Sequence, residues 1–396
     1  MGTLLQGSTG KSSVRSFSLR CVIRLLLINA GALLLLLSAT PSCSRKETGF
    51  ETQMIDGVKV VRNLALKTQK GNPRLVFSEE VSIGGDDDAG GSLFYTPVDI
   101  DSDAEGNIYV LDSRDAVVRI FDRRGSLTRT IGRKGQGPGE FESPICMDVS
   151  ADGTIVVVDQ SLMRLTTMAR NGDFVRSNLL KEYISDIKLV NAGTLVAGYS
   201  EPQTSRACVG LYEIDTGQMT PLFSQETFWP ARLMNNELAY DFPYFVRFAL
   251  GAQARLYAGS GVAYEITAMS LAGRIEVKFR KDQERIPVQG EMLDRISNMT
   301  LRGSNPYARN PHFPFFESLS VDERGRIWVQ HYLPKISNLT NPETPYDVFS
   351  PEGIFLFEAR IPGHISSKPV FKSGFLYALR KIESGYVRAI RLKVRE

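Results

Sequence analysis

Residues 130–141, TIGRKGQGPGEF, place four glycines beside Arg133 and Lys134. The backbone N–H groups of such a loop can cradle a phosphate, especially next to cationic side chains. A phosphate loop of the Walker type also needs a lysine followed by Ser or Thr, and then a helix. This loop instead runs into ICMDV, which has the pattern of a strand, and Pro138 removes one backbone donor. We therefore interpret the stretch as a structural connector.

Two aspartates stand where acid–base chemistry is conceivable. Asp112 and Asp159 each close an apolar run, IYVLD and IVVVD, and a pair of carboxylates can perform acid–base catalysis. Both residues stand at the same point of one recurring pattern. The sequence therefore favours a structural role, in which each side chain caps the turn that follows.

Side chains that commonly hold metals are scarce. The three histidines, His312, His331 and His364, lack H-x-H and H-E-x-x-H spacing. Cys146 and Cys208 lack CxxC spacing, and nothing in the sequence supports a disulfide between them. No G-x-S-x-G motif occurs, which disfavours a serine hydrolase. We expect no cofactor and no metal.

An internal repeat organises these residues. PVDIDSDAEGNIYVLDS (97–113) aligns with PICMDVSADGTIVVVDQ (144–160) at a constant offset of 47 residues. A clear further copy is SLSVDERGRIWVQHY (318–332), and weaker ones lie near 185–200, 246–260 and 368–381. Along the first offset nine pairs are identical: Pro97/Pro144, Asp101/Asp148, Ala104/Ala151, Gly106/Gly153, Ile108/Ile155, Val110/Val157, Asp112/Asp159, Arg123/Arg170 and Gly125/Gly172.

Each unit has the pattern of four short strands, here named a to d. In the first unit we expect them at about 98–103, 107–113, 117–123 and 126–133, separated by turns such as EGN and RRG. Six repeats of roughly 40–50 residues with four strands each predict an all-β fold, a six-bladed β-propeller.

The last unit has only three strands before the chain ends. RLVFSEEVSIGG (74–85) is expected to supply its outer strand, which closes the ring and removes an open sheet edge. VKVVRNL (58–64) is expected to add a strand beside it.

The first unit also resembles a known family. DAEGNIYVLDSRDAVVRIFDRRGSLTRTIGRKGQGPGEFESP (103–144) is similar to an NHL-type repeat of six-bladed β-propellers. The layout of the whole chain resembles the six-bladed propeller lipoproteins of bacteria with elaborate outer membranes. This resemblance implies the fold, but these families share no single activity.

The first 43 residues differ in kind from the rest. Lys11, Arg15, Arg20 and Arg24 precede the apolar run LLLINAGALLLLL (25–37) and then small residues, which is the pattern of a secretory signal peptide. The run is shorter than the roughly 20 residues that a membrane-spanning helix needs.

Cys43 follows the apolar run and resembles the lipidated cysteine of the bacterial lipobox. Thr40 stands where that motif usually has Leu, and ordinary cleavage near Ala39 is the alternative. We expect a signal peptide over 1–43, a tether over 44–56 and the propeller over 57–396.

Composition excludes one class of partner. With 42% apolar and 23% charged residues the chain is that of a folded globular protein. The signal carries four cations and no carboxylate, so its removal changes the net charge from +3 to −1. Nothing in the mature chain suggests a nucleic-acid surface.

The lengths of the loops separate the two faces of the ring. The a–b and c–d turns share one face and are short, whereas the b–c loops and the blade-to-blade connectors share the other. That face carries the long segments 224–245, 281–316 and 331–345, and long loops on a rigid scaffold are where binding residues concentrate. Segment 288–303 has the apolar spacing of a short helix that packs on the ring.

Candidate binding residues follow from departures from the repeat and from the longest loops. Tyr199 and His331 replace the repeated aspartate, and Phe313, Phe315 and Phe316 have packing as their simplest role. The full candidate set for ligand or partner binding is Arg114, Asp115, Tyr199, Tyr307, Arg309, His312, His331, Tyr332 and Lys335.

The expected function is that of a binding or scaffold protein at the cell envelope, anchored by lipid at Cys43 and facing the periplasm or the cell surface, or otherwise soluble in the periplasm. Its partner is expected to be an envelope protein, a peptide or a glycan, its membrane contact the lipid anchor only, and its state monomeric. The alternative is a channel-centred enzyme of the lyase or lactonase type, which would need calcium or zinc.

Overall fold

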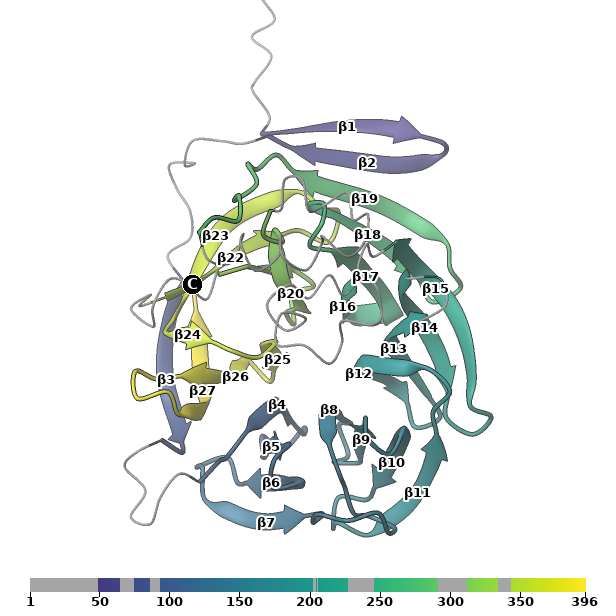
Figure 1. The fold of residues 1–396 in the computed structure, drawn as a ribbon. Coiled ribbons are helices and arrows are strands. Elements are labelled where there is room, and N and C mark those ends of the chain that lie inside the picture. The colour runs from purple at the N-terminus through teal and green to yellow at the C-terminus, as the bar shows by residue number, and fades with distance from the viewer. Residues whose placement is uncertain are drawn as a thin grey trace, which may run out of the picture. The chain divides into compact units, whose positions relative to one another are not determined.

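The computed structural model describes residues 49–64, 75–85, 93–201, 204, 206–226, 246–290, 312–333 and 343–396, all within the unit Gly49–Glu396. These residues form six sheets that follow one another around a central axis (Figure 1). The prediction of an all-β, six-bladed propeller is confirmed. No helix in this part of the chain is long and apolar enough to cross a bilayer.

Blades one and two each contain four antiparallel strands in chain order, with the first strand innermost. Strands β5 and β9, the runs IYVLD and IVVVD, are buried along their whole length, as expected for strands covered on both faces. The bounds are β4 (Pro97–Ser102), β5 (Ile108–Asp112), β6 (Val117–Phe121), β7 (Leu127–Ile131), β8 (Pro144–Val149), β9 (Ile155–Asp159), β10 (Arg164–Met168) and β11 (Phe174–Leu179).

Blades three and four repeat this order. Their strands are β12 (Tyr183–Asn191), β13 (Thr194–Glu201), β14 (Arg206–Glu213), β15 (Gln218–Glu226), β16 (Val246–Leu250), β17 (Arg255–Ser260), β18 (Glu265–Ser270) and β19 (Ile275–Lys281). A short 3-10 helix, η2 (Ala252–Ala254), forms the a–b turn of blade four.

Blade five is regular, whereas the inner strand of blade six is split in two. The bounds are β20 (Phe316–Val321), β21 (Ile327–His331), β22 (Glu343–Phe349), β23 (Phe355–Pro362), β24 (His364–Ile365), β25 (Val370–Lys372), β26 (Phe375–Lys381) and β27 (Val387–Arg395).

Strand β3 (Val76–Ile83) completes blade six from the N-terminal side. It pairs antiparallel with β27, from Val76 opposite Arg395 to Ile83 opposite Ala389. The predicted closing strand is therefore confirmed. Val81 and Ile83 of β3 are buried in a cluster with Tyr377 and Leu379 of the same blade.

The prediction for 58–64 was wrong. Strand β2 (Val58–Asn63) does not lie beside β3 but pairs in parallel with β19, the outer strand of blade four. Buried Asn63 contributes to this placement: its Nδ2 donates to the carbonyl oxygens of Arg280 and Gly353, and its Oδ1 accepts the N–H of Phe355 at 2.7 Å. One side chain thus ties β2 to blades four and five.

A hairpin precedes this strand. Residues that the sequence analysis assigned to the tether form β1 (Phe50–Ile55), which pairs antiparallel with β2. The helix expected over 288–303 lies mostly outside the described residues.

The repeated glycines of the c–d turns set how closely blades approach. Gly125, Gly172 and Gly353 have φ of 88°, 90° and 82°. A Cβ at Gly125 would lie 2.9 Å from Val81, and one at Gly353 would lie 2.5 Å from Phe279, both on the outer strand of the preceding blade. Only glycine combines this conformation with this close contact.

The stretch TIGRKGQGPGEF forms the predicted connector between β7 and β8. The carboxylate of Glu140, a residue of the connector itself, binds inside the loop. Its Oε2 accepts the N–H of Gly137 at 2.8 Å, and its Oε1 accepts from Arg133 Nε at 2.7 Å. Phe141 is fully buried and covers Gly132. The loop therefore holds an internal carboxylate, and the structural interpretation is confirmed.

Ring closure by β3 yields a stability prediction. Replacing Ile83, 5% exposed, by Ala should lower the free energy of unfolding by about 2–4 kcal/mol, because it leaves a cavity in blade six. Val76→Ala on the same strand, 49% exposed, is the control and should change little. Urea unfolding of both variants measures the difference, and equal effects would show that β3 does not contribute its buried face to the core.

Candidate functional site

Charged side chains from all six blades line the channel along the axis. β4 contributes Asp99 and Asp101, β8 contributes Asp148, and β12 contributes Asp186 and Lys188. Because side chains two residues apart point to the same face of a strand, each such pair reaches the channel together. The remaining blades add Arg247 from β16, Glu317 from β20, Lys368 between β24 and β25, and Lys372 from β25.

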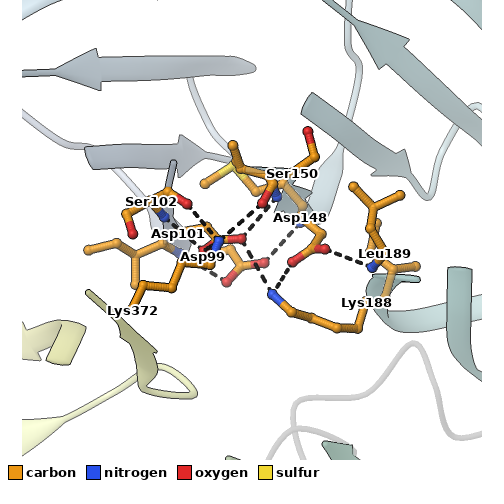
Figure 2. A network of polar contacts seen from close by, with 12 residues as sticks. Asp99, Asp101, Ser102, Asp148, Ser150, Lys188, Leu189 and Lys372 are labelled. Carbon is orange, nitrogen blue, oxygen red and sulfur yellow. Dashed lines mark hydrogen bonds and ion pairs between the residues drawn. The ribbon is translucent and has the colours of Figure 1, made fainter. Parts of the chain in front are cut away.

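Three carboxylates fasten one blade to the next. Asp99 and Asp101 accept the backbone N–H groups of Met147 and Val149, each at 2.9 Å, so β4 is bonded to β8 through side chains. Asp148, the repeat equivalent of Asp101, accepts the N–H of Leu189 on β12 at 2.7 Å. Figure 2 shows Asp99, Asp101 and Asp148 close together, with the contact from Asp148 to Leu189.

Two lysines join the same network (Figure 2). Lys188 donates to Asp148 and lies 3.5 Å from Asp101 Oδ2. Lys372, from blade six, donates at 2.6 Å both to Asp101 Oδ1 and to the carbonyl oxygen of Ser102. Four blades therefore meet in one cluster of salt bridges.

The lysines hold Asp101 ionised, whereas burial and the neighbouring charge of Asp101 raise the pKa of Asp148 above its usual value. Burial alone would raise the pKa of Asp101, but Lys188 and Lys372 outweigh it and hold that pKa well below its usual value. Burial likewise would lower the pKa of Lys188, but Asp101 and Asp148 raise it above its usual value. Asp101 and Lys188 are therefore charged at neutral pH.

Asp99 behaves differently, although it lies on the same strand. Burial raises its pKa to about 7, and the nearby charges of Asp186 and Asp101 add to this effect. The backbone N–H of Met147 acts in the opposite direction but does not compensate. Asp99 is thus a carboxyl group that changes protonation near neutral pH.

A cavity of about 610 Å³ opens beside this network at the end of the channel that carries the a–b turns. We call it the channel mouth; its wall includes the a–b turn residues Ala104, Ala151 and Ala192. Asp148, Lys188 and Lys372 line it together with the apolar side chains of Phe371, Leu189 and Val190. Its volume lies within the range that is usual for small-ligand pockets.

Two smaller cavities continue along the axis. One of about 130 Å³ shares Asp148, Lys188 and Lys372 with the channel mouth. The next, of about 210 Å³, shares Asp99, Asp186 and Lys368 with the middle cavity. The shared lining residues place the three cavities one after another along the axis.

The repeated aspartates have the capping role that the sequence predicted. Asp112 accepts the N–H groups of Tyr95, Thr96 and Asp115 at 2.7–3.2 Å, and an ion pair links it to Arg119. Asp159 does the same for Glu142, Ser143 and Leu162. Both close a b–c turn and hold the connector that enters the blade.

Other predicted site residues lie near this b–c face. The Arg114 guanidinium lies 5.4 Å from the centre of the Tyr95 ring, and Asp115 pairs with Arg119. His331 Nε2 lies 3.1 Å from Oδ2 of buried Asp347. Tyr264 donates to the same oxygen, and Lys281 donates to Oδ1. Burial alone would raise the pKa of Asp347, but His331 and Lys281 lower it, so this buried carboxylate joins blades four and five.

Two candidates are packing residues. Tyr199 is 3% exposed and packs in the core between blades two and three, so packing explains why it replaces the repeated aspartate. Tyr332 is 8% exposed and stacks on Phe313, with ring centres 5.5 Å apart. Phe316 is buried, as its packing role predicts.

The remaining candidates are only partly placed. His312 is half-buried and bridges to Pro287, whereas Tyr307, Arg309, Lys335 and the lipidation candidate Cys43 lie outside the described residues. Cys146 and Cys208 are buried free thiols.

The lysines of the channel were missed by the sequence analysis. Lys188, Lys368 and Lys372 have no identical partner in another unit, so the search for repeats passed over them. A usable signal existed: each is a charge beside apolar residues in a predicted inner strand, where burial is expected and an ion has to find a counter-charge.

Comparisons with known proteins agree with this fold. Residues 100–283 match the family profile DUF5128, described as a 6-bladed beta-propeller. A solved structure from Bacteroides fragilis NCTC 9343, of a protein inferred to be exported, superposes with a TM-score of 0.54 at 13% identity, over 85% of this chain and 100% of the other. A member of the DUF4221 family from Bacteroides vulgatus ATCC 8482 gives 0.55 at 12% identity, over 81% and 98%. No curated protein matches the chain.

The unusual titration of Asp99 can be measured as a stability. The pKa of Asp99 is about 7 in the folded protein and about 4 in the unfolded chain. The stabilisation that comes from protonating Asp99 is therefore complete at low pH and is lost as the pH rises through about 7. Asn does not titrate. The stability of Asp99→Asn relative to the native chain should therefore increase as the pH rises from about 5 to about 8.

Urea unfolding at several pH values tests this expectation. Asp122→Asn, in the turn between β6 and β7, is the matched control. Backbone hydrogen bonds lower the pKa of Asp122. The stability of Asp122→Asn relative to the native chain should therefore not change between about pH 5 and about pH 8. Parallel pH profiles of the two variants would overturn the assignment to Asp99.

Proposed function

We propose that the protein is an exported, lipid-anchored binding protein of the cell envelope that receives its ligand in the channel mouth. The observation that carries this proposal is the cavity of about 610 Å³ at the end of the axis, where Asp148, Lys188 and Lys372 converge. Groups from three blades meet there, and binding sites commonly lie where rigid elements meet in a concave surface.

The arrangement supports binding more than catalysis. Lys188 and Lys372 are held by carboxylates and carbonyl oxygens, so they form a fixed pattern of charge and hydrogen-bonding groups. Among the described residues, no three His, Cys, Asp or Glu side chains converge as a metal ion requires. This favours the binding role over the metal-dependent lyase or lactonase alternative.

The chemistry of the mouth supports a ligand from the envelope. The Asp148 carboxylate and the Lys188 ammonium, beside the ring of Phe371, can bind the hydroxyl groups of a glycan or the amide groups of a peptide. Lys372 contributes its charge, because its three N–H donors are taken by Asp101, Ser102 and Val149. The ring supplies a preorganised site, which lowers the entropic cost of binding. The partner is thus proposed to be an envelope glycan, a peptide or a segment of an envelope protein, with this chain acting as a monomer.

Export and anchoring come from the N-terminal sequence. The basic, apolar and small-residue segments before Cys43 support a signal peptide, and the similarity to a protein of Bacteroides fragilis inferred to be exported is consistent with it. Few residues separate Cys43 from β1, so a lipid on Cys43 would be attached close in sequence to the first strand.

The site is tested by filling the mouth. Ala192 is an exposed a–b turn residue in its wall, so Ala192→Trp should obstruct it and leave the core intact. Ala272→Trp, at the exposed c–d turn of blade four, is the matched control. An oligosaccharide or peptide that raises the melting temperature of the native protein should lose most of that effect with Ala192→Trp and keep it with Ala272→Trp.

The same assay compares the two faces. Arg114→Ala removes an exposed cation on the b–c face, where the sequence placed the binding residues. If Arg114→Ala abolishes the thermal shift and Ala192→Trp does not, the b–c face is the binding surface and the channel mouth is not.

Anchoring is tested at one residue. Cys43→Ser should move the protein from the membrane fraction to the soluble fraction and abolish labelling by a fatty-acid analogue, because a serine cannot carry the thioether-linked lipid. Unchanged partitioning and labelling in the variant would refute the lipid anchor.

A further inference from the structure

The third cavity, of about 210 Å³, lies at the opposite end of this series of cavities from the channel mouth. It lies beyond the middle cavity and is lined from all six blades. Its charged groups are the carboxylates of Asp99, Asp186 and Glu317 and the cations of Arg247 and Lys368. We call it the inner compartment.

Two of its three carboxylates are balanced by cations in the same wall. Lys368 Nζ lies 2.9 Å from Asp186 Oδ2. Burial lowers the pKa of Arg247, and the charge of Glu317 partly offsets that effect, which places the guanidinium in the field of this carboxylate. Asp186 and Glu317 therefore match the two cations in number.

Asp99 is the carboxylate that remains. Its Oδ1 accepts the N–H of Ile100 and its Oδ2 the N–H of Met147, both at 2.9 Å. Among the described residues, no Lys, Arg or His nitrogen forms an ion pair with it. Two neutral donors offset only part of the cost of burying a carboxylate.

The neutral polar side chains of the wall form hydrogen bonds with other groups of the protein. Ser318 donates to Gln330 Oε1 at 2.8 Å, Gln330 Nε2 donates to the carbonyl oxygen of Ile365, and Ser367 Oγ accepts the N–H of Leu379. Val98, Ile145, Phe248 and Leu319 supply the apolar part of the wall. Among the described residues, the compartment thus offers one carboxylate without a paired cation, beside a wall of mixed polarity.

We propose that the inner compartment binds a small organic cation, a primary ammonium group on a short aliphatic chain, with the ammonium paired to Asp99. Such a ligand supplies the missing counter-charge, and its chain contacts the apolar wall. The volume of about 210 Å³ matches a ligand of only a few non-hydrogen atoms, since one water occupies about 30 Å³ of liquid. This goes beyond the proposed function, whose ligand occupies the mouth.

Binding of such a cation is linked to protonation. An ammonium ligand pairs with the ionised form of Asp99, so it displaces the proton that burial favours. Asp99 is half protonated near pH 7, so binding there should release about half a proton. The titratable and charged groups around it on the inner strands are Asp101, Cys146, Asp148, Asp186, Lys188, Arg247, Glu317, Lys368 and Lys372.

Titration calorimetry with n-butylamine tests the proposal on the mature protein. In two buffers of different ionisation enthalpy at pH 7, binding to the native protein should release about half a proton. Release should vanish near pH 9, where Asp99 is already ionised and the amine is still charged. n-Butanol, the same chain without charge, should not bind detectably at millimolar concentration.

Matched variants assign the effect to one residue. Asp99→Asn keeps one of the two acceptor oxygens, enough for the N–H of Met147 on the next blade, and should weaken n-butylamine binding by about 10- to 100-fold. Asp122→Asn should leave the binding unchanged. Equal binding of n-butylamine and n-butanol by the native protein, or no binding of either, overturns the proposal without the need for a folded variant. Tighter binding of glycine than of n-butylamine also overturns it, because the site would then recognise a zwitterion.

Discussion

Pairing of β3 with β27 is the constraint on which the rest of the structure depends. Blade six would otherwise have three strands and an open edge. The same strand contacts Gly125 of blade one through Val81 and Ile83, so it also sets the distance between the last and first blades. Only a closed ring brings Lys372 to Asp101, which lies 271 positions earlier in the chain.

Closure alone does not fix how adjacent inner strands align with each other. The channel carboxylates fix this alignment. Asp99, Asp101 and Asp148 each bond a backbone N–H of the next blade. Burying these groups is costly, and well-placed hydrogen bonds and counter-charges offset the cost. Replacing one by an apolar side chain would leave a buried N–H without an acceptor. The same atoms therefore fix blade geometry and create the charge pattern of the channel.

Features that repeat from blade to blade could be predicted from the sequence. Contacts that form only when the ring closes could not. Offset identities identified the blades, the capping role of Asp112 and the closing strand, because each follows from local pattern and edge pairing. The position of β2 rests on contacts with residues more than 200 positions away, among them the hydrogen bonds of buried Asn63 and the pairing with β19. Lys188 and Lys372 meet Asp101 only across the finished ring. Loop length pointed to the b–c face, whereas the described cavities lie on the axis.

The contrast between Asp101 and Asp99 shows how small differences in this ring separate structure from function. Both lie on β4, face the channel and accept a backbone N–H from β8. Lys372 and Lys188 reach Asp101, whose charge is thereby satisfied within the protein. Lys368, the nearest equivalent deeper in the channel, pairs with Asp186 instead. A ring that was selected for stability alone would gain from a cation at Asp99. Its absence among the described residues is physically costly, and an external cation in the adjoining cavity would remove that cost.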